Sequence, residues 1–346
     1  MKTALLQQPP PFETGGLALA LGLTPDQALA AWQAVRAVSQ ADGAPGQRSI
    51  RLLEVSAHAL GVTPEQARDI DVASVFASPA MRRSVVDALV IPACIEGEVT
   101  LARERSVLSI AKQLDLRSHW AELLPALRRR RVLTVKRALA LRSPDARRIF
   151  QRLWQEEGLL GVARAISFVL GLYRDASLAA RFHALADCPD GSLGRAVVDH
   201  FRARGIAYPG EKHGMPERMV HHDLMHVLNG YDTDPAGECE LAAFYAAFAD
   251  GDAFTFFVTV LATFHLGLGV SPAIVKPARF AFDPERAVAA FVRGRSLRAD
   301  VMGPWDYWEL MPLPISEAQA RLGLDIQPAA SPGGAAAAPV AGTSQQ

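Results

Sequence analysis

The sequence predicts an all-α fold, and three observations lead to that prediction. Apolar residues recur at helical spacing in nearly every periodic segment, and no useful length of chain alternates with period two. Helix-start signals are present, because Thr24 precedes Pro25 and Thr63 precedes Pro64 where two such segments begin. A chain of 346 residues, 50% of them hydrophobic, can also bury two cores of ordinary size. We therefore expect two helical bundles.

The two ends of the chain have the composition of segments without a core. Residues 1–22 include "MKTALLQQPPPFETGG", whose proline cluster and lack of a sustained apolar run predict a flexible lead-in rather than a signal peptide. Residues 327–346 are rich in Ala, Pro, Gly and Ser, which is typical of disorder. The three cysteines lack CxxC spacing and favour free thiols in a reducing compartment. We expect a cytoplasmic protein, either free or attached peripherally to the inner face of a membrane.

Charge and hydropathy exclude two classes of partner. Lys plus Arg and Asp plus Glu both number 36, so no net field attracts nucleic acid, and we expect no nucleic-acid partner. The run from Ala253 to Val270 has eighteen residues without a formal charge. It contains three threonines and a histidine and lacks a basic flank, so a helix buried in the protein core is favoured over a transmembrane helix.

The first third of the chain contains a weak internal repeat. A shift of 54 residues places Asp42-Gly43 on Glu96-Gly97, and each copy has the pattern helix, acidic-Gly turn, helix. This arrangement resembles the tellurite-resistance TerB-like domain, a small helical bundle with two related halves, over about residues 23–130. We assign residues 23–140 to such a domain.

The TerB-like resemblance implies a metal site in the acidic turns, as in some members of that family. The available carboxylates are Asp42, Glu54, Glu96, Glu98 and Glu104. An acidic residue before glycine equally suits a tight helix exit without any ion, so both interpretations stay open.

Four consecutive arginines, residues 128–131, stand within a helical pattern that is predicted to continue through "VLTVKRALALR". Consecutive arginines point all round a helix, so most of them are expected in solvent. Contact with anionic lipid headgroups is the alternative. A further helical pattern begins at Ser143, and residues 141–174 are predicted to form a helix that connects the two domains.

The segment "HHDLMHVLNGYDTDPAGECE" contains the strongest candidate for a functional site. On an α-helix His222 and His226 lie roughly 40° apart, and Asp223 lies roughly 100° from His222 on the same side as His226. Asn229-Gly230 predicts the end of this helix, and Glu238 would then open the next one. Two helices joined by a loop would bring the four side chains together.

Neutral imidazoles and ionised carboxylates are the usual ligands of zinc and similar divalent ions in sites that keep exchangeable positions. The pattern differs from the HExxH motif of zinc proteases, and Asp223 is better placed as a ligand or as an orienter of His222. Without a metal, these residues would form a polar helix pair in which Asp223 holds a histidine. Five neighbours are not expected to take part: His221, Asp232, Asp234, Cys239 and Glu240.

The spacing HDxxH, eleven further residues and a glutamate is similar to the signature of the ubiquinone-biosynthesis Coq-four family. "PDGSLGRAVVDHFRARGI", from Pro189, resembles its Pro-x-Gly-Thr-Leu-Gly segment, with Ser192 in place of threonine. "YWELMPLPISEAQARLGLDI", from Tyr307, resembles its Trp-Glu and Arg-x-x-Leu-Gly ending, with Arg321 directly before Leu322 and a shorter spacing. The match covers about residues 175–325, and we assign residues 175–326 to a metal-binding helical domain.

The resemblance implies that His222, Asp223, His226 and Glu238 hold a divalent ion, commonly taken to be zinc. It also implies a helical domain that associates peripherally with membranes and binds a polyprenylated aromatic precursor of ubiquinone. The implied activity replaces the ring carboxyl by hydroxyl, an oxidative decarboxylation, although no separate general base is identifiable. A second view of the family makes it an organiser of the biosynthetic complex.

Two other functions stay open on the sequence. One is a metal-dependent hydrolase, because a site of histidines and carboxylates can also activate water. The other is a non-enzymatic lipid-binding scaffold whose TerB-like half recruits partners near a membrane. The sequence leaves open the metal, the prenyl chain length and the oligomeric state, a homo-oligomer included.

Overall fold

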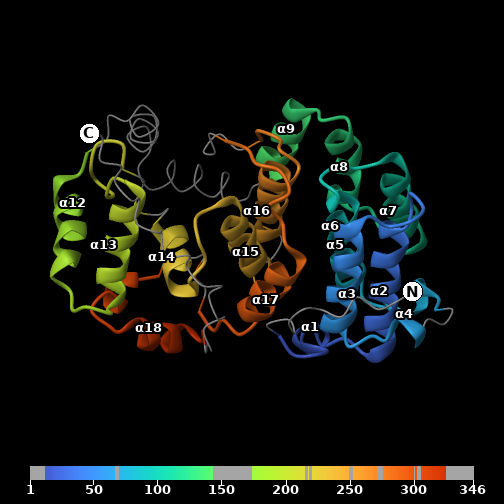
Figure 1. The fold of residues 1–346 in the computed structure, drawn as a ribbon, viewed down its shortest axis with the longest axis horizontal. Helices are drawn as coiled ribbons and strands as arrows, with labels where there is room; N and C mark the ends of the chain where they lie inside the picture. The colour runs from blue at the N-terminus through green and yellow to red at the C-terminus, as the bar shows by residue number, and fades with distance from the viewer. Residues whose placement is uncertain are drawn as a thin grey trace, which may run out of the picture.

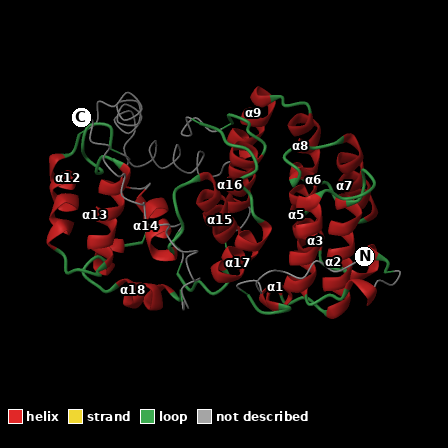
Figure 2. Cartoon of the chain, viewed as in Figure 1, coloured by secondary structure: helices red, strands yellow, loops and turns green. Residues whose placement is uncertain are grey.

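The computed structural model describes residues 12–66, 70–142, 174–214, 217, 220–248, 252–270, 276–299, 301 and 305–324. The regular elements in these ranges are all helical, which confirms the predicted all-α class (Figure 2). Strand-like pairing there is confined to two isolated bridges, Ser192 with Pro314 and Leu266 with Arg279. None of the helices in these ranges has both the length and the apolar composition that a bilayer span requires.

The helices of the first half gather at one end of the molecule, and α9 reaches toward its middle (Figure 1). They are α1 (Gly16–Leu21), α2 (Pro25–Ser39), α3 (Gln47–Leu60), α4 (Val72–Val75), α5 (Pro79–Ala88), α6 (Val90–Cys94), α7 (Leu101–Gln113), α8 (His119–Arg128) and α9 (Val132–Arg142), with a 3-10 turn, η1, at Pro64–Gln66. The greater part of the predicted connecting helix, residues 143–173, lies outside the described residues, as does the predicted tail.

The second half extends from the middle of the molecule to the opposite end, where α12, α13, α14 and α18 lie (Figure 1). Its elements are α12 (Ala176–His183), η3 (Ala184–Asp187), α13 (Leu193–Arg204), α14 (Val220–Asn229), α15 (Pro235–Ala246), α16 (Asp252–Val260), the π-helical turn η5 (Leu261–His265), α17 (Pro284–Gly294), η6 (Tyr307–Leu310) and α18 (Ile315–Leu322). Helix α14 packs against α13, α15 and α18, while α17 packs against α3 and α16 against α9.

The two Thr-Pro signals have different outcomes. Thr24 caps α2 as predicted, and its capping box with Gln27 is complete. The signal at Thr63 produces only the short turn η1, and residues 67–69 are not described. The N-terminal segment, which was predicted to be a flexible lead-in, contains the helix α1. A hydrogen bond from Gly15 N–H, just before α1, to the His58 carbonyl oxygen (2.9 Å) connects it to α3.

The two copies of the internal repeat form hydrogen bonds with each other. Asp42 accepts hydrogen bonds from Thr100 Oγ1 (2.7 Å) and Arg103 Nε (2.8 Å) at the start of α7. Glu96 accepts one from the backbone N–H of Ser49 (2.9 Å) at the start of α3. The shift of 54 residues carries Ser49 onto Arg103, which also donates to Ser49 Oγ (3.1 Å). Each acidic turn therefore stabilises the helix start of the other copy.

The arginine run breaks the helix that was predicted to continue through it. Arg128 ends α8 and pairs with Glu104 (2.6 Å), and Arg130 adopts a left-handed φ of 49°. Its guanidinium donates to the carbonyl oxygens of Leu266 and Gly267 (3.0 and 3.1 Å). These carbonyls follow the π-helical turn and need donors, so they hold Arg130 in a conformation that an uninterrupted helix would not allow.

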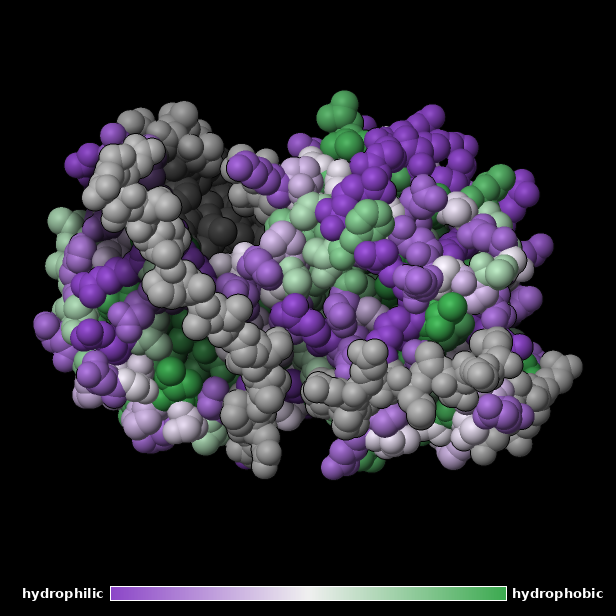
Figure 3. All heavy atoms as spheres, viewed as in Figure 1, coloured by the Kyte–Doolittle hydropathy of each residue, from purple (hydrophilic) through white to green (hydrophobic). Residues whose placement is uncertain are grey.

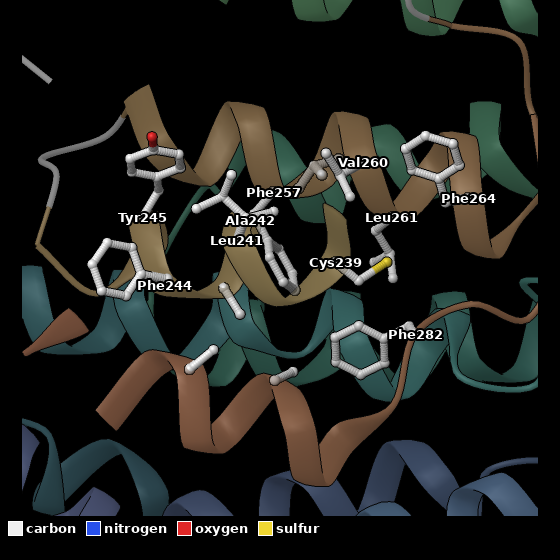
Figure 4. Packing of buried hydrophobic residues seen from close by; sticks show 14 of the residues in the cluster. Cys239, Leu241, Ala242, Phe244, Tyr245, Phe257, Val260, Leu261, Phe264 and Phe282 are labelled. Atoms are coloured by element: carbon white, nitrogen blue, oxygen red, sulfur yellow. The ribbon is translucent and has the colours of Figure 1, made fainter. Parts of the chain in front are cut away.

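Buried apolar residues of both halves form one continuous core, so the division into two bundles stays a prediction. In the middle of the molecule α15 lies between α16 and α17, with Leu241, Phe257 and Phe282 among the packed side chains (Figure 4). The run from Ala253 to Val270 is largely buried there, which agrees with the expectation of a core helix. Its regular α-helix ends at Val260, where η5 begins.

Candidate metal centre

The loop between α14 and α15 is shaped by two glycines and an aspartate. Gly230 ends α14 in the left-handed conformation (φ 68°), at the predicted helix stop. Asp234 caps α15 by accepting a hydrogen bond from Gly237 N–H (2.7 Å). A Cβ at Gly237 would lie 1.9 Å from the carbonyl oxygen of Asp232, so only glycine lets the loop fold back this closely. The turn sets Glu238, in the first turn of α15, against the histidines of α14.

His222, His226 and Glu238 form a compact group of ligand-type atoms, all within 4.8 Å of one another. The two histidine Nε2 atoms are 3.2 Å apart; that of His222 lies 3.4 Å from Oε2 of Glu238, and that of His226 lies 3.4 Å from Oε1. Zinc bonds of about 2.0–2.1 Å in a tetrahedron require ligand atoms about 3.3 Å apart. The three side chains therefore converge closely enough to serve as three ligands of one divalent ion, which would leave a position for another ligand.

The environment of each histidine suits this use. His226 is fully buried, and its Nδ1 lies 3.3 Å from the Tyr231 carbonyl oxygen. That carbonyl can only accept, so Nδ1 carries the proton and the Nε2 lone pair faces the group. The side chain of His222 is 33% exposed, which opens the group on one side.

Electrostatics couple the three residues. Burial lowers the pKa of His222, but the hydrogen bond and charge of Glu238 outweigh it, so the net shift is upward. Burial raises the pKa of Glu238, but its interactions with the neighbouring imidazoles of His222 and His226 bring it down to about 2. The carboxylate is therefore ionised at neutral pH, as a metal ligand must be.

Asp223 does not join this group. Its Oδ1 lies 3.1 Å from Nε2 of His200 on α13, and both side chains are almost completely buried. A step of one residue on a helix turns Asp223 by about 100° from His222, and here that turn aims it at α13. A polar hollow of about 390 Å³ lies beside His200 and His226. As a ligand, Asp223 stays a prediction.

His200 was missed by the sequence prediction. It lies inside an amphipathic helix, 23 residues before Asp223, and no motif spacing links the two. Its ring stacks at 6.4 Å from that of His226, so it belongs to the surroundings of the group. Only the packing of α13 on α14 could show this.

The neighbours set aside by the sequence prediction have structural roles. His221 packs against Trp305 and Tyr307, with ring centres 5.3 and 5.2 Å away. Glu240 forms two hydrogen bonds with Arg286 (2.6 and 2.7 Å). The remaining members are Asp232, which accepts from Arg204, Asp234, the cap of α15, and Cys239, a buried free thiol.

The two stretches that flank the motif in the family resemblance meet one another in space. Backbone N–H groups of Leu193 and Gly194 donate to the carbonyl oxygens of Leu313 and Met311 (both 2.8 Å). A Cβ at Gly194 would lie 3.0 Å from that Met311 oxygen. In the second stretch Gln319 donates to the carbonyl oxygen at residue 228 of α14 (2.8 Å). Together the stretches brace the helix that carries both histidines.

The acidic turns of the first half form no second group of this kind in the described ranges. Asp42 and Glu96 accept hydrogen bonds from residues at helix starts across the repeat. Glu104 pairs with Arg128, Glu54 with Arg51 (3.9 Å), and Glu98 is exposed. The interpretation of these carboxylates as structural turn residues therefore has the support of their contacts.

No family model, curated protein or solved structure matches the chain.

Proposed function

We propose that the chain holds one divalent metal ion, zinc, between His222, His226 and Glu238. The observation that carries this proposal is the close approach of the donor atoms: the two Nε2 atoms are 3.2 Å apart, and each lies 3.4 Å from a different oxygen of the Glu238 carboxylate, spacings close to those between ligands of a tetrahedral site. Two histidines and one glutamate leave a coordination position for a substrate or water, which is the pattern of catalytic rather than structural zinc. Asp223 is a further candidate ligand in this proposal, which the resemblance implies.

The substrate class that we propose is a polyprenylated aromatic precursor of ubiquinone. The similarity of three stretches to the ubiquinone-biosynthesis family supports it, and those stretches lie on one structural unit around α14. The surroundings are also apolar on one side: the ring of Phe256 on α16 lies 5.9 Å from that of His222, and Tyr245 packs against Phe256 at the same distance. An aromatic head and an isoprenoid chain both suit such a wall.

The reaction that we propose is replacement of the ring carboxyl by hydroxyl. A bound metal would supply Lewis-acid stabilisation of charge on the ring oxygens and carboxylate. The conversion of an aryl carboxylic acid to a phenol and carbon dioxide also needs one oxygen atom from dioxygen, whose other atom leaves as water with two protons and two electrons from an external reductant. The residues of this chain would hold the ion, orient the head group against Phe256 and exclude water.

A non-enzymatic lipid-binding scaffold is the second candidate. The observation that favours it is that the buried side chains of Asp223 and His200 hydrogen-bond each other. Neither is then available as a general base for a reaction at the group. A scaffold would bind the same metal and lipid without turning the lipid over.

The test combines metal content, bound lipid and complementation. The purified chain should contain one ion per molecule by elemental analysis, and co-purifying prenylated aromatic lipid should be visible by mass spectrometry. In a strain without its resident ubiquinone protein of this kind, the chain should restore quinone production, and the His226→Ala, Glu238→Gln double variant should not. His221→Phe, which keeps the packing on Trp305, is the matched control and should behave as the unchanged chain.

The outcomes separate the candidates. Rescue by the double variant would eliminate the catalytic proposal. Loss of rescue with retained lipid would favour the metal-dependent reaction, whereas loss of both would mean that the metal is needed for lipid binding. One bound ion without prenylated lipid or rescue would leave the metal site standing and overturn the substrate class.

A further inference from the structure

The segment from Leu123 to Arg142 concentrates positive charge in a chain that is neutral as a whole. It contains seven basic residues and no acidic one. Two of the seven already have partners within the protein, because Arg128 pairs with Glu104 and Arg130 binds two backbone carbonyl oxygens. The charge run is therefore not uniformly solvated, and its remaining members need a separate explanation.

Four of the remaining basic residues face outward. Arg129 and Arg131 are exposed in the turn between α8 and α9, and Lys136 and Arg137 are exposed on α9. No acidic side chain of the described ranges forms an ion pair with any of these four. Self-repulsion among unpaired like charges is unfavourable, and an anionic partner would relieve it.

Two leucines project from the same face. Leu133 is 82% exposed and Leu141 is 54% exposed. On the helix, Leu133, Arg137 and Leu141 follow one another at four-residue spacing and so share one side, while Val135 and Leu139 are buried on the other side. Figure 3 shows hydrophobic atoms projecting at the top of the molecule, where Figure 1 places α9, beside hydrophilic surface. Helix α9 is thus apolar on its inner side and carries both leucines and cations on its outer side.

We propose that this outer face docks on an anionic lipid surface. The face consists of Arg129, Arg131, Leu133, Lys136, Arg137 and Leu141, and we call it the α9 surface. In the docked state the leucines enter the boundary of the acyl chains, and the cations lie at the level of the phosphate headgroups. The two features require each other: leucines alone would not select anionic lipid, and cations alone would not need exposed leucines.

The leucines favour lipid over the other polyanions. Nucleic acid is bound through phosphate contacts and aromatic stacking, and an exposed leucine side chain contributes to neither. On an anionic membrane the cations and the leucines both contribute to binding, since each Lys or Arg near the surface and each buried CH₂ group strengthens it. The proposal does not depend on the metal centre, although α16, which carries Phe256 beside His222, packs directly against α9.

Co-sedimentation of the full chain with vesicles tests the proposal. Vesicles of phosphatidylcholine with 30 mol% phosphatidylglycerol are compared with pure phosphatidylcholine, with and without EDTA, so that failure of the metal site does not affect the result. We expect binding to the anionic vesicles only, weakening with salt. Lys136→Gln with Arg137→Gln should weaken binding roughly 30-fold, at about fivefold per charge. Leu133→Ser should weaken it about tenfold.

Matched controls lie elsewhere on the surface. Leu19→Ser changes a leucine of equal exposure (83%), and Arg202→Gln with Lys212→Gln removes two exposed cations; both should leave binding unchanged. Insertion into the membrane is measured separately, with an environment-sensitive dye attached to Leu133→Cys. The labelled variant also carries Cys188→Ala, because the other two cysteines are buried and should not react. The dye should shift to the blue on anionic vesicles, and the same dye on Leu19→Cys should not.

Several results would overturn the proposal: no binding to anionic vesicles, equal binding to neutral ones, or equal weakening by the control variants. Tighter binding to a labelled RNA or DNA oligonucleotide than to vesicles, unaffected by Leu133→Ser, would assign the cations to nucleic acid instead. Circular dichroism and thermal unfolding test whether each variant is folded. If the Lys136→Gln, Arg137→Gln variant does not fold, the dye measurement still tests the proposal.

Discussion

Nε2 of His200 lies 3.1 Å from Oδ1 of Asp223, so the aspartate beside the first histidine of the motif is paired with α13 and is not among the three grouped residues His222, His226 and Glu238. Both side chains are buried, and each satisfies the other. The relationship separates Asp223 from the group formed by His222, His226 and Glu238. It also gives Asp223 the part of a residue that fixes how α13 packs on α14.

Asp223→Asn tests that part, because asparagine keeps an acceptor for His200 while removing the charge. We expect a loss of about tenfold in zinc affinity, the size of an outer-sphere effect, and no change in the number of bound ions. His226→Ala should remove binding altogether. Titration calorimetry with Zn²⁺ measures both, and a loss as complete for Asp223→Asn as for His226→Ala would make Asp223 a direct ligand.

The contact between Gly97 and Phe280 predicts a difference between two glycines at equivalent positions of the repeat. Both have positive φ, 81° at Gly97 and 102° at Gly43. A Cβ at Gly97 would lie 2.1 Å from Cε1 of Phe280, whereas a Cβ at Gly43 would meet nothing within 4 Å. Alanine at Gly43 should therefore cost only the backbone strain, about 1 kcal/mol, and alanine at Gly97 about 2–4 kcal/mol.

Urea unfolding of the two glycine variants measures this difference. Phe280→Ala combined with Gly97→Ala should recover most of the excess cost, since it removes the ring that the new Cβ would touch. Equal destabilisation by the two alanines would show that the first half does not press against the loop that carries Phe280.

The imidazole of His265 predicts a pH dependence of stability. Its Nε2 lies 2.9 Å from the Ile95 carbonyl oxygen, and its Nδ1 accepts from Phe282 N–H (3.2 Å). Burial has the largest effect on His265 and lowers its pKa; the hydrogen bond to the Ile95 carbonyl opposes this, nearby Arg48 lowers the pKa further, and the net shift is downward. The unfolded state then binds a proton more readily than the folded state. Stability should be complete above about pH 6.5 and fall as the pH drops below it.

His265→Leu should flatten the fall in unfolding free energy between pH 7 and pH 5, while lowering stability at neutral pH by about 2–4 kcal/mol through the lost hydrogen bonds. His119→Gln, at an exposed position, is the control. Chemical unfolding at a series of pH values reports both. A variant that keeps the wild-type pH slope would exclude His265 as its source.

The carboxylate of Asp42 predicts a purely structural function for the acidic turns. It pairs with Arg103, which is only 3% exposed, so Asp42→Asn weakens the support of a buried guanidinium. We expect a loss of about 1–3 kcal/mol, moderated because Asp42 itself is partly in solvent. Glu98→Gln, in the exposed part of the second turn, should cost almost nothing.

The metal content of two variants tests how many metal sites the chain has. Elemental analysis of Glu238→Gln should find no tightly bound metal, and Asp42→Asn should retain one ion per chain. Metal that survives Glu238→Gln and is lost with Asp42→Asn would place a second site in the repeat.

Local patterns determined much of this protein from the sequence alone. The helical class, the cap at Thr24, the stop at Gly230 and the burial of the run after Ala253 all depend on neighbours along the chain, where spacing and capping chemistry act directly. His222, His226 and Glu238 were also predictable, because two residues on one helix face and a third after a short loop need little tertiary information.

Tertiary packing decided what those patterns could not. Asp223 and His200 are 23 residues apart, Arg130 binds carbonyls more than 130 residues away, and the two acidic turns stabilise each other's copies. In each case a polar group found its partner on a distant part of the chain, and where the group is buried, as in Asp223 and His200, leaving it unsatisfied would cost more than a local preference provides. Asp223 is therefore paired with His200 on α13, and the helix breaks at the arginine run, because the partners of these groups lie on other elements of the fold.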